Sequence, residues 1–421
     1  MKILFVLENL ADRCGANVNI AIVLAKQLSK SCEVHALVRY DDVKPVSDNK
    51  KEVFDCVRMF YADQAGKLAK FTSDDWNKAG KSAKILRLCK SPSTFVSMVD
   101  AKYYDFSITR RKCRKAVEKV CKKEKYNAVI AVSAPYYIMQ AVAEANITSH
   151  KMALQLDPFT NNYTLTSRFK NRRRKIEIKT NKKLCAVFAG DYMYDDLITV
   201  VPNGNGDIVS TPLPGLICEN MVEQAEKRKI DNKIDNKKVN FIFVGQFYEE
   251  IRNPHYLLEL FTALPSSYIL HIVGGGCDKE FEKYTQILGE RLVRHGWVSK
   301  NEANAFIEQF DILINVNNTI TNQLPSKIFE YISTGKPILN ICKFDECLSR
   351  PYMDRYNNGI SVVEKQTLLE DNVGKINAFV ENHLNTVLGK DEILENFERN
   401  TDVYVAKLIF DKISQITDGD K

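Results

Sequence analysis

The sequence predicts an α/β protein built from two domains, each with a Rossmann-like parallel sheet. Residues 3–7 form a short apolar run, followed by a polar loop, a helical pattern and a second apolar run, which is a βαβ succession. A comparable succession begins again with the apolar run at 239–244. A chain of 421 residues is also too long for one ordinary hydrophobic core.

The first domain is expected to begin with a strand at 3–7, a loop over 8–16, a helix over 20–28 and a strand at 33–38. Gly15 stands at the helix start, where a residue without a side chain lets a ligand approach the backbone. We take Gly15 as a ligand-binding candidate. It is a lone glycine and not a Gly-x-Gly-x-x-Gly fingerprint, so the sequence gives only weak support for a dinucleotide site.

Two further strands are expected at 128–132 and 151–156. Between the two parts of this sheet, residues 63–105 are expected to be irregular and to contribute to binding specificity. Asp157 directly follows a strand, at an end where acid/base or acceptor-binding groups tend to project, and we take it as a catalytic candidate. The alternative is an Asp-Pro turn with a purely structural role.

The second domain is expected to open with the strand at 239–244, which turns at Gly245 into a loop that contains Arg252. The planar guanidinium of Arg252 can bind a phosphate through two N–H groups, so this arginine is a donor-binding and catalytic candidate. The alternative is a surface ion pair with Glu249 or Glu250.

A strand at 268–273 ends in three glycines that begin with Gly274. These glycines permit a sharp turn, a close ligand approach, or both. A short strand edge follows at 294–298, and a nucleobase could pack along Trp297 and Val298. A core position is the expected alternative for both of these residues.

A strand at 311–316 leads into a polar loop that contains Asn322, and Pro325 and Ser326 then open a helix that Gly335 ends. Ser326 is the expected side-chain cap of this helix. The loop and the helix start lie at the carboxyl edge of a parallel sheet, where open α/β folds bind ligands.

Inside this helix, Ile328, Phe329 and Ile332 are expected to share an apolar face, and the opposite face is expected to hold Lys327, Glu330, Tyr331 and Thr334. Lys327 and the helix N-terminus suit a phosphate, and the Glu330 carboxylate could accept hydrogen bonds from two sugar hydroxyls. The alternative is an exposed Lys/Glu pair on a core helix.

The run Pro325-Ser-Lys-Ile-Phe-Glu-Tyr-Ile332, followed by Gly335-Lys-Pro-Ile338, resembles the donor-site segment of nucleotide-sugar glycosyltransferases, in particular the family-4-like enzymes of glycosyl transferases group 1. The resemblance implies a GT-B architecture, in which two Rossmann-like domains face each other across a cleft. It also implies that Glu330 holds the donor ribose and that Pro325, Ser326 and Lys327 line the donor site.

Two positions depart from the pattern of that family. Gln246 stands where an arginine usually follows the glycine, so phosphate binding would depend on Arg252 and Lys327. Asn322 lies eight positions before Glu330, near where the family often has a second glutamate, and an amide can hydrogen-bond a sugar without carrying charge. Asn322 therefore stays a catalytic candidate, and a retaining, metal-independent reaction is implied by the resemblance alone.

The same resemblance suggests how the chain divides. We predict an acceptor domain over residues 1–205, which ends at the Pro-Asn-Gly run after an apolar strand at 198–201. A linker is expected over 206–238 and a nucleotide-sugar donor domain over 239–390. The C-terminal helix over 391–421 is expected to return to the first domain.

Composition excludes several classes of protein. Eleven cysteines without a Cys-x-x-Cys pair and six dispersed histidines predict reduced thiols in a cytoplasmic protein, without a metal site or another cofactor. No apolar run reaches the roughly 20 residues that span a bilayer. The run at 1–7 predicts a first strand and not a secretory signal.

The formal charge of +7 is unevenly distributed. One cluster of basic residues contains a single glutamate and comprises Arg168, Lys170, Arg172, Arg173, Arg174, Lys175, Lys179, Lys182 and Lys183. Such a cluster can bind an anionic membrane surface, with a solvated helix face as the alternative. No nucleic-acid-binding module accompanies it, so we expect no nucleic acid partner.

The sequence thus predicts a glycosyltransferase that moves a sugar from a nucleotide sugar to a saccharide or lipid-linked saccharide, in the assembly of surface polysaccharide, at the inner face of a membrane. Two alternatives remain open. One is a catalytically silent binding or scaffold subunit, suggested by Gln246 and Asn322. The other is a sugar-nucleotide epimerase, which would need carboxylate acid/base groups in its cleft.

Overall fold

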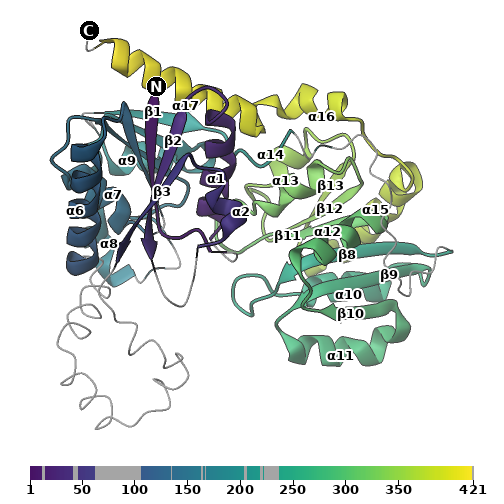
Figure 1. Ribbon diagram of the computed structural model, residues 1–421. Coiled ribbons are helices and arrows are strands. Elements are labelled where there is room, and N and C mark those ends of the chain that lie inside the picture. Colours follow the sequence, from purple (N-terminus) through teal and green to yellow (C-terminus); the bar gives the residue numbers. More distant parts are fainter. Residues whose placement is uncertain are drawn as a thin grey trace. The chain divides into compact units, whose positions relative to one another are not determined.

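The computed structural model describes residues 1–11, 15–40, 46–61, 106–133, 135–162, 165, 167–202, 206–218, 221 and 237–419. The expected irregular segment at 63–105 lies outside these residues. The chain forms two compact units (Figure 1). Unit 1 comprises Met1–Pro214 together with Asp402–Lys421, and unit 2 comprises Gly215–Thr401.

Unit 1 contains a parallel sheet with the strand order β3-β2-β1-β4-β5-β6-β7. The middle strands β4 and β6 are completely buried and β1 is buried after its first residue, as is typical of parallel strands that helices cover on both faces. The strands are β1 (Lys2–Leu7), β2 (Glu33–Tyr40), β3 (Cys56–Tyr61), β4 (Ala128–Val132), β5 (His150–Gln155), β6 (Ala186–Gly190) and β7 (Asp207–Thr211).

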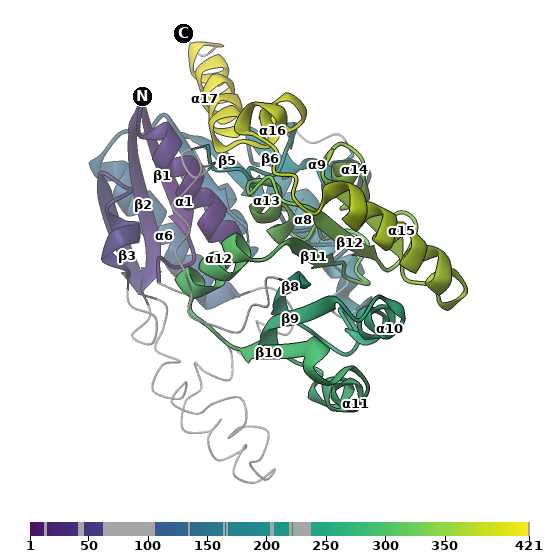
Figure 2. The same ribbon diagram turned by 90° about the vertical axis from the view of Figure 1, so that its right-hand side faces the viewer.

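Helices α6, α7 and α9 share a single core with one face of this sheet (Figure 1). Helices α1 and α17 pack against each other (Figure 2). A buried hydrogen bond of 2.6 Å joins Gln27 Nε2 on α1 to Asp402 Oδ2 at the start of α17. The helices are α1 (Ala16–Leu28), α2 (Asp48–Lys51), α6 (Ser107–Lys123), α7 (Tyr137–Glu144), η2 (Ser167–Phe169), α8 (Lys170–Asn181), α9 (Asp191–Val200) and α17 (Asp402–Gly419).

Unit 2 contains a second parallel sheet, with the order β10-β9-β8-β11-β12-β13. One face packs on α10, α11 and α15 to form the core of the unit. The strands are β8 (Val239–Gln246), β9 (Tyr268–Gly275), β10 (Leu292–Gly296), β11 (Ile312–Val316), β12 (Ile338–Cys342) and β13 (Gly359–Val363). The helices are α10 (His255–Ala263), α11 (Asp278–Leu288), η3 (Gly289–Arg291), α12 (Lys300–Gln309), α13 (Lys327–Ile332), α14 (Arg350–Met353), η4 (Gln366–Leu368), α15 (Leu369–His383), α16 (Lys390–Phe397) and η5 (Glu398–Asn400).

The predicted α/β class with two Rossmann-like sheets is confirmed, and several local predictions are wrong. The strand expected at 198–201 is the end of helix α9, and the strand that follows is β7, inside the expected linker. β7 is a half-exposed edge strand that pairs with β6, so its sequence lacks an apolar run. Unit 1 therefore extends to Pro214, and unit 2 includes α16, so the division of the chain differs from the expected boundaries at 205 and 390.

Candidate functional site

In unit 2, the strand order reverses between β8 and β11, which is the position where doubly wound folds bind ligands. The loops that follow these two strands are joined by hydrogen bonds. Thr319 N donates to Ile251 O over 2.8 Å, and Thr319 Oγ1 donates to Glu250 O over 3.1 Å. The two loops therefore form one rigid rim at the carboxyl edge of the sheet.

Arg252 lies in this rim. Its side chain is half-buried, and its Nε donates to Asn318 Oδ1 over 3.0 Å. No carboxylate among the described residues lies within ion-pair distance of Arg252, so the alternative of a pair with Glu249 or Glu250 is not observed. Burial lowers the pKa of Arg252, although a guanidinium stays protonated at neutral pH. The rim thus presents a cation that lacks an acidic partner.

Gly245, the last residue but one of β8, lies next to this cation. A Cβ atom at Gly245 would lie 3.8 Å from Arg252 Nη1, which is van der Waals distance. The sequence singled out both residues, but it missed Asn318, which orients the guanidinium through Nε. The position of Asn318, two residues after a buried strand, is the signal that could have identified it.

Tyr331 also faces this region, which corrects its predicted place on the polar face of the helix. Its side chain is 1% exposed, and its hydroxyl accepts a hydrogen bond of 3.3 Å from Val244 N. Burial raises the pKa of Tyr331 well above its usual value. The aromatic ring thus belongs to the layer between α13 and the end of β8, directly below the rim.

Replacing Tyr331 with phenylalanine should lower the free energy of unfolding by about 1–3 kcal/mol, because the buried Val244 N–H would lose its acceptor. Chemical denaturation followed by circular dichroism would measure this loss. Tyr248→Phe is the matched control, since its hydroxyl bonds Gln246 Oε1 at an exposed position and its removal should change stability by less than about 0.5 kcal/mol. Equal effects of the two substitutions would contradict the assigned role of the Tyr331 hydroxyl.

The start of α13 differs from the expected phosphate site. Ser326 has helical backbone angles and its side chain makes no capping hydrogen bond, so the predicted cap is wrong. The helix has six residues, which limits its dipole. Lys327 Nζ and Glu330 Oε2 form an exposed ion pair over 3.1 Å, with 36% and 44% of the two side chains exposed. The structure therefore agrees with the alternative interpretation of this pair, and the roles predicted for Ser326, Lys327 and Glu330 stay predictions.

The remaining donor-site candidates have different environments. Asn322 is 6% exposed and Pro325 is also buried, whereas Val298 is half-buried. The expectation of a core position is wrong for Trp297, which is 69% exposed. Its indole lies beside Gly275, because a Cβ atom at that glycine would meet Trp297 Nε1 at 3.0 Å. An exposed ring at the carboxyl end of β10 can stack on a planar ligand.

The glycines at the end of β9 are explained by contacts between strands. Gly274 is paired with Gly245, and a Cβ atom at Gly274 would lie 1.8 Å from Gly245 O. A Cβ atom at Gly276 would lie 2.2 Å from Phe247 O. Both residues have a positive φ, of 119° and 98°. Close approach of backbones therefore accounts for Gly274, and its predicted contact with the donor stays a prediction.

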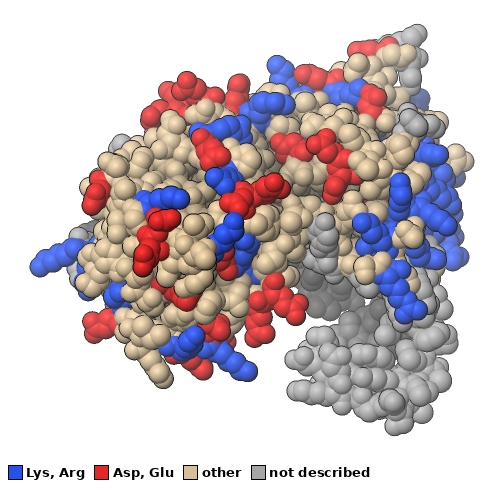
Figure 3. Space-filling model, turned by 180° about the vertical axis from the view of Figure 1, so that it is seen from behind, with Lys and Arg blue, Asp and Glu red and all other residues tan. Residues whose placement is uncertain are grey.

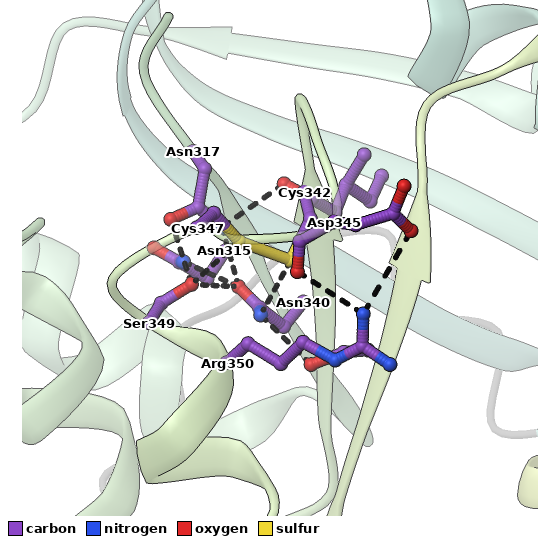
Figure 4. Close-up of a disulfide and its surroundings, with 10 residues drawn as sticks. Asn315, Asn317, Asn340, Cys342, Asp345, Cys347, Ser349 and Arg350 are labelled. Atoms are coloured by element: carbon purple, nitrogen blue, oxygen red, sulfur yellow. Dashed lines mark hydrogen bonds and ion pairs between the residues drawn. A yellow bond between two sulfur atoms is a disulfide. The ribbon is translucent and has the colours of Figure 1, made fainter. Parts of the chain in front are cut away.

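A buried polar network follows the carboxyl ends of β11 and β12 (Figure 4). Asn340 Oδ1 accepts hydrogen bonds of 2.7 Å from both Asn315 Nδ2 and Asn317 Nδ2, and one of 3.1 Å from Ser349 Oγ. Ser349 Oγ also lies 2.7 Å from Asn317 Oδ1. The network fixes the loop after β12 against the strand end that leads to Asn318.

The structure joins Cys342 and Cys347 in a disulfide within this loop, in contrast to the expected set of reduced thiols (Figure 4). Lys343 lies inside the closed ring, where it pairs with Glu364 over 2.5 Å and donates to Asn253 O over 3.3 Å. The ring is thus connected to the residue that follows Arg252. The two cysteines are five positions apart in the sequence, a spacing that matches no known disulfide or metal-binding motif, so the sequence alone did not indicate this pair.

In unit 1, the strand order reverses between β1 and β4. Asn17, in the first turn of α1, donates through Nδ2 to Ser133 O over 3.2 Å and to Asp157 Oδ2 over 2.8 Å. The amide therefore links the ends of β4 and β5 at the carboxyl edge. Gly15 precedes α1 with an extended backbone that any residue can adopt, so its conformation does not require glycine.

Asp157 is half-buried, and burial raises the pKa of its carboxyl above the usual range, while the hydrogen bond from Asn17 opposes the shift. A carboxyl with a raised pKa at a ligand-binding edge is a candidate for acid/base chemistry. The sequence identified Asp157 but missed Asn17, which stands in a helical pattern without a distinguishing signal.

The raised pKa of Asp157 predicts a specific dependence of stability on pH. The folded state holds the proton more tightly than the unfolded state, so this group's contribution is fully present below the unfolded pKa and is lost as pH rises through the folded pKa. Asp157→Asn should therefore raise the melting temperature relative to the wild type at pH 7 more than at pH 4. A difference between the two proteins that is the same at both pH values would contradict the shift.

Comparison with known proteins finds a family match for part of the chain. Residues 238–350 match the family described as glycosyl transferases group 1, which confirms the resemblance found at 325–338. The chain is also 30% identical over 88 residues to an uncharacterized 41.2 kDa protein in the cps region of Klebsiella pneumoniae. That match spans 21% of this chain and 24% of the relative.

Solved structures extend the comparison to the whole fold. The chain resembles the lipopolysaccharide outer core galactosyltransferase WaaB with a TM-score of 0.60, at 17% identity over 99% of each chain. It resembles Alr3699/HepE of Anabaena, solved with UDP, with a TM-score of 0.63, at 13% identity over 99% of this chain and 100% of that one. HepE was also solved with UDP-glucose. These likenesses confirm the GT-B fold.

Among the described residues, no group of three or more His, Cys, Asp or Glu side chains could hold a metal ion. The helices in the described part of the chain are also too short or too polar to cross a membrane.

Proposed function

We infer that this chain, whose residues 238–350 belong to glycosyl transferases group 1, transfers a sugar from a nucleotide sugar to a saccharide or lipid-linked acceptor. The observation that supports this most directly is Arg252, a half-buried cation without a carboxylate partner among the described residues, at the point where the strand order of unit 2 reverses. A diphosphate leaving group needs such a charge, since departure of the nucleotide leaves a second negative charge to stabilise.

The donor is proposed to be a uridine diphosphate sugar, because a protein of the same fold was solved with UDP and with UDP-glucose. Arg252 would bind the diphosphate, the ring of Trp297 and the side chain of Val298 would contact the nucleobase, and Glu330 would bind the ribose. We propose that no metal takes part, because Arg252 supplies the positive charge, and that the anomeric configuration is retained. Activity that persists in EDTA, and the anomer of the product observed by NMR, would test these two points.

A thermal-shift titration with UDP is the primary test of the donor site. A ligand that binds only the folded state stabilises it by about 2.7 kcal/mol at one hundred times its Kd. We expect UDP to raise the melting temperature of the wild type and to have little effect on Arg252→Met. No shift with any nucleotide or nucleotide sugar would reject the proposed donor site.

Two alternative functions would give different results. A silent binding subunit would bind UDP-sugar but transfer nothing across a panel of acceptors, and the amides at Gln246 and Asn322 are the observations that favour it. An epimerase would interconvert the free nucleotide sugar without an acceptor. Transfer of labelled sugar to an acceptor would contradict both alternatives.

The match to a protein from a cps region, together with the fold shared with WaaB, supports a role in surface polysaccharide synthesis. We propose that the protein works at an anionic membrane surface, where it meets its lipid-linked acceptor. Helix α8 supports this, because all its Lys and Arg residues except Arg173 are exposed. Figure 3 shows basic side chains gathered in a patch at the right of the view.

Flotation with vesicles tests the membrane proposal. Binding is expected to vesicles with anionic lipid and to decline between 0.15 M and 1 M salt, because salt screens exposed charges. Equal recovery with neutral and anionic vesicles would reject the membrane proposal. It would not bear on the proposed sugar transfer, which an assay with a soluble acceptor tests separately.

A further inference from the structure

The exposed basic face of α8 has a buried counterpart on the opposite side of the helix. Arg173 and Glu177, one helical turn apart, are each only 1% exposed. Charged side chains are rarely buried so completely, because removal from water costs several kcal/mol unless hydrogen bonds compensate. Apolar residues at these positions would pack α8 against its neighbours α7 and α9 without the cost of removing charges from water. The two charges therefore require an explanation beyond packing.

Both charged side chains bind the main chain of a single short segment, residues 156–160, which directly follows β5 and contains Asp157. Arg173 Nε donates to Phe159 O over 2.9 Å, and Arg173 Nη2 donates to Thr160 O over 3.1 Å. Glu177 Oε2 accepts from Thr160 N over 3.0 Å. Three main-chain groups of the segment are thus held by charge-assisted hydrogen bonds from two side chains, and these bonds favour the observed backbone conformation.

The same segment is fixed from two other sides. Glu177 Oε1 accepts a hydrogen bond of 2.7 Å from Gln155 Nε2, which also lies 3.4 Å from Asp157 O. The ring of Phe159 stacks on Tyr136 at a centroid distance of 3.8 Å. Glu177 therefore connects the residue two positions before Asp157 with the residue three positions after it.

Hydrogen bonds thus reach Asp157 at two points, from Asn17 Nδ2 to the carboxylate and from Gln155 Nε2 to the main-chain carbonyl. Its carboxylate is oriented by α1, and its backbone is oriented through α8. We propose that Arg173 and Glu177 are positioning residues, which hold the segment 156–160 so that the Asp157 carboxyl meets the acceptor. The proposal rests on the proposed function, because it assigns Asp157 to the acceptor-dependent step.

The test uses Glu177→Gln, which keeps the shape of the side chain but removes the charge. A misplacement of about 1 Å can cost 100-fold in rate, so we expect kcat for sugar transfer to fall about 10- to 100-fold. The KM for the nucleotide sugar and the thermal shift with UDP should not change, because the proposed donor site lies in unit 2. Asp195→Asn, an exposed carboxylate on α9, is the matched control and should leave kcat unchanged.

A double-mutant cycle distinguishes positioning from loss of stability. If Glu177 acts through Asp157, then Glu177→Gln should not reduce kcat further in a protein that already has Asp157→Asn. In the single variant Glu177→Gln, the apparent pKa of the pH–rate limb that depends on Asp157 should also shift. Additive losses in the double variant, or an unchanged profile, would overturn the proposal.

Arg173→Lys provides an independent check if Glu177→Gln does not fold. Lysine keeps the charge but cannot donate to both carbonyl groups as the planar guanidinium does, so an intermediate loss of kcat is expected. Wild-type kcat in Arg173→Lys would overturn the proposal. If the wild type itself transfers no sugar, the proposed function fails. If it transfers sugar and Asp157→Asn is fully active, only the role of the 156–160 segment fails.

Discussion

Arg252→Met is expected to lower kcat/KM for sugar transfer by about 100- to 1000-fold, the usual loss when one group that stabilises a developing anion is removed. Methionine keeps the apolar part of the side chain in the half-buried rim but removes the charge and the donors. Arg252→Lys should fall between the wild type and Arg252→Met, because an ammonium group retains the charge without the two-pronged geometry. Steady-state kinetics with a labelled nucleotide sugar would measure the losses.

The control for this experiment is Arg355→Met. Arg355 precedes β13, and its guanidinium stacks on Tyr352 and Phe397 at the amino end of the sheet. Its substitution removes the same charge from unit 2 but not from the rim, so kcat/KM should stay within about twofold of the wild type, the change that ~0.4 kcal/mol produces. Comparable losses of kcat/KM in Arg252→Met and Arg355→Met would show that the loss follows from the net charge of unit 2 and not from the position of Arg252 in the rim.

Gly274→Ala is expected to have the largest effect on stability. The new Cβ atom would lie 1.8 Å from Gly245 O, and the φ of 119° is unfavourable for alanine. Backbone strain of about 1–3 kcal/mol and overpacking of about 1–3 kcal/mol give a combined loss on the order of 2–6 kcal/mol. Urea denaturation in the absence of ligand would measure this loss. Unit 2 of Gly274→Ala should unfold at a lower urea concentration than unit 2 of the wild type.

Gly374→Ala is the matched control, because this glycine lies inside α15 and a Cβ atom there meets nothing within 4 Å. Alanine is favoured over glycine in a helix, so a gain of about 0.5–1 kcal/mol is expected. If Gly274→Ala were also neutral or stabilising, the close pairing of β8 and β9 at their carboxyl ends would be incorrect.

The sequence predicted the strands at the centre of each sheet because their short apolar runs are bounded by polar or glycine-containing loops, whereas the similar run at 198–201 is the end of helix α9. β7 was missed, since an edge strand with half-exposed residues resembles a loop. The single helix expected over 391–421 is in fact two helices, α16 and α17, which η5 separates. Thr401, the residue before α17, is buried, so the break does not stand out as a polar loop. Local periodicity does not reveal such a break.

The candidate site was predictable where a charged residue lies in the segment that follows a strand, as with Arg252 and Asp157. It was not predictable where distant segments meet. Asn17 reaches Asp157 across 140 residues of sequence, and Tyr331 reaches Val244 across 87. The Lys327–Glu330 pair was given a ligand-binding role by its helix position, whereas in the structure the two side chains bind each other.

Because α17 packs on α1 and belongs to unit 1, this unit is made from two segments that all of unit 2 separates in the sequence. The contact between α1 and α17 therefore closes a loop of several hundred residues, whereas every contact of unit 2 closes a shorter one. A longer loop costs more conformational entropy to close, and contacts between distant residues form more slowly. We expect α17 to dock on α1 late in refolding, and pulse-labelled hydrogen exchange would show this as late protection of the α17 amides.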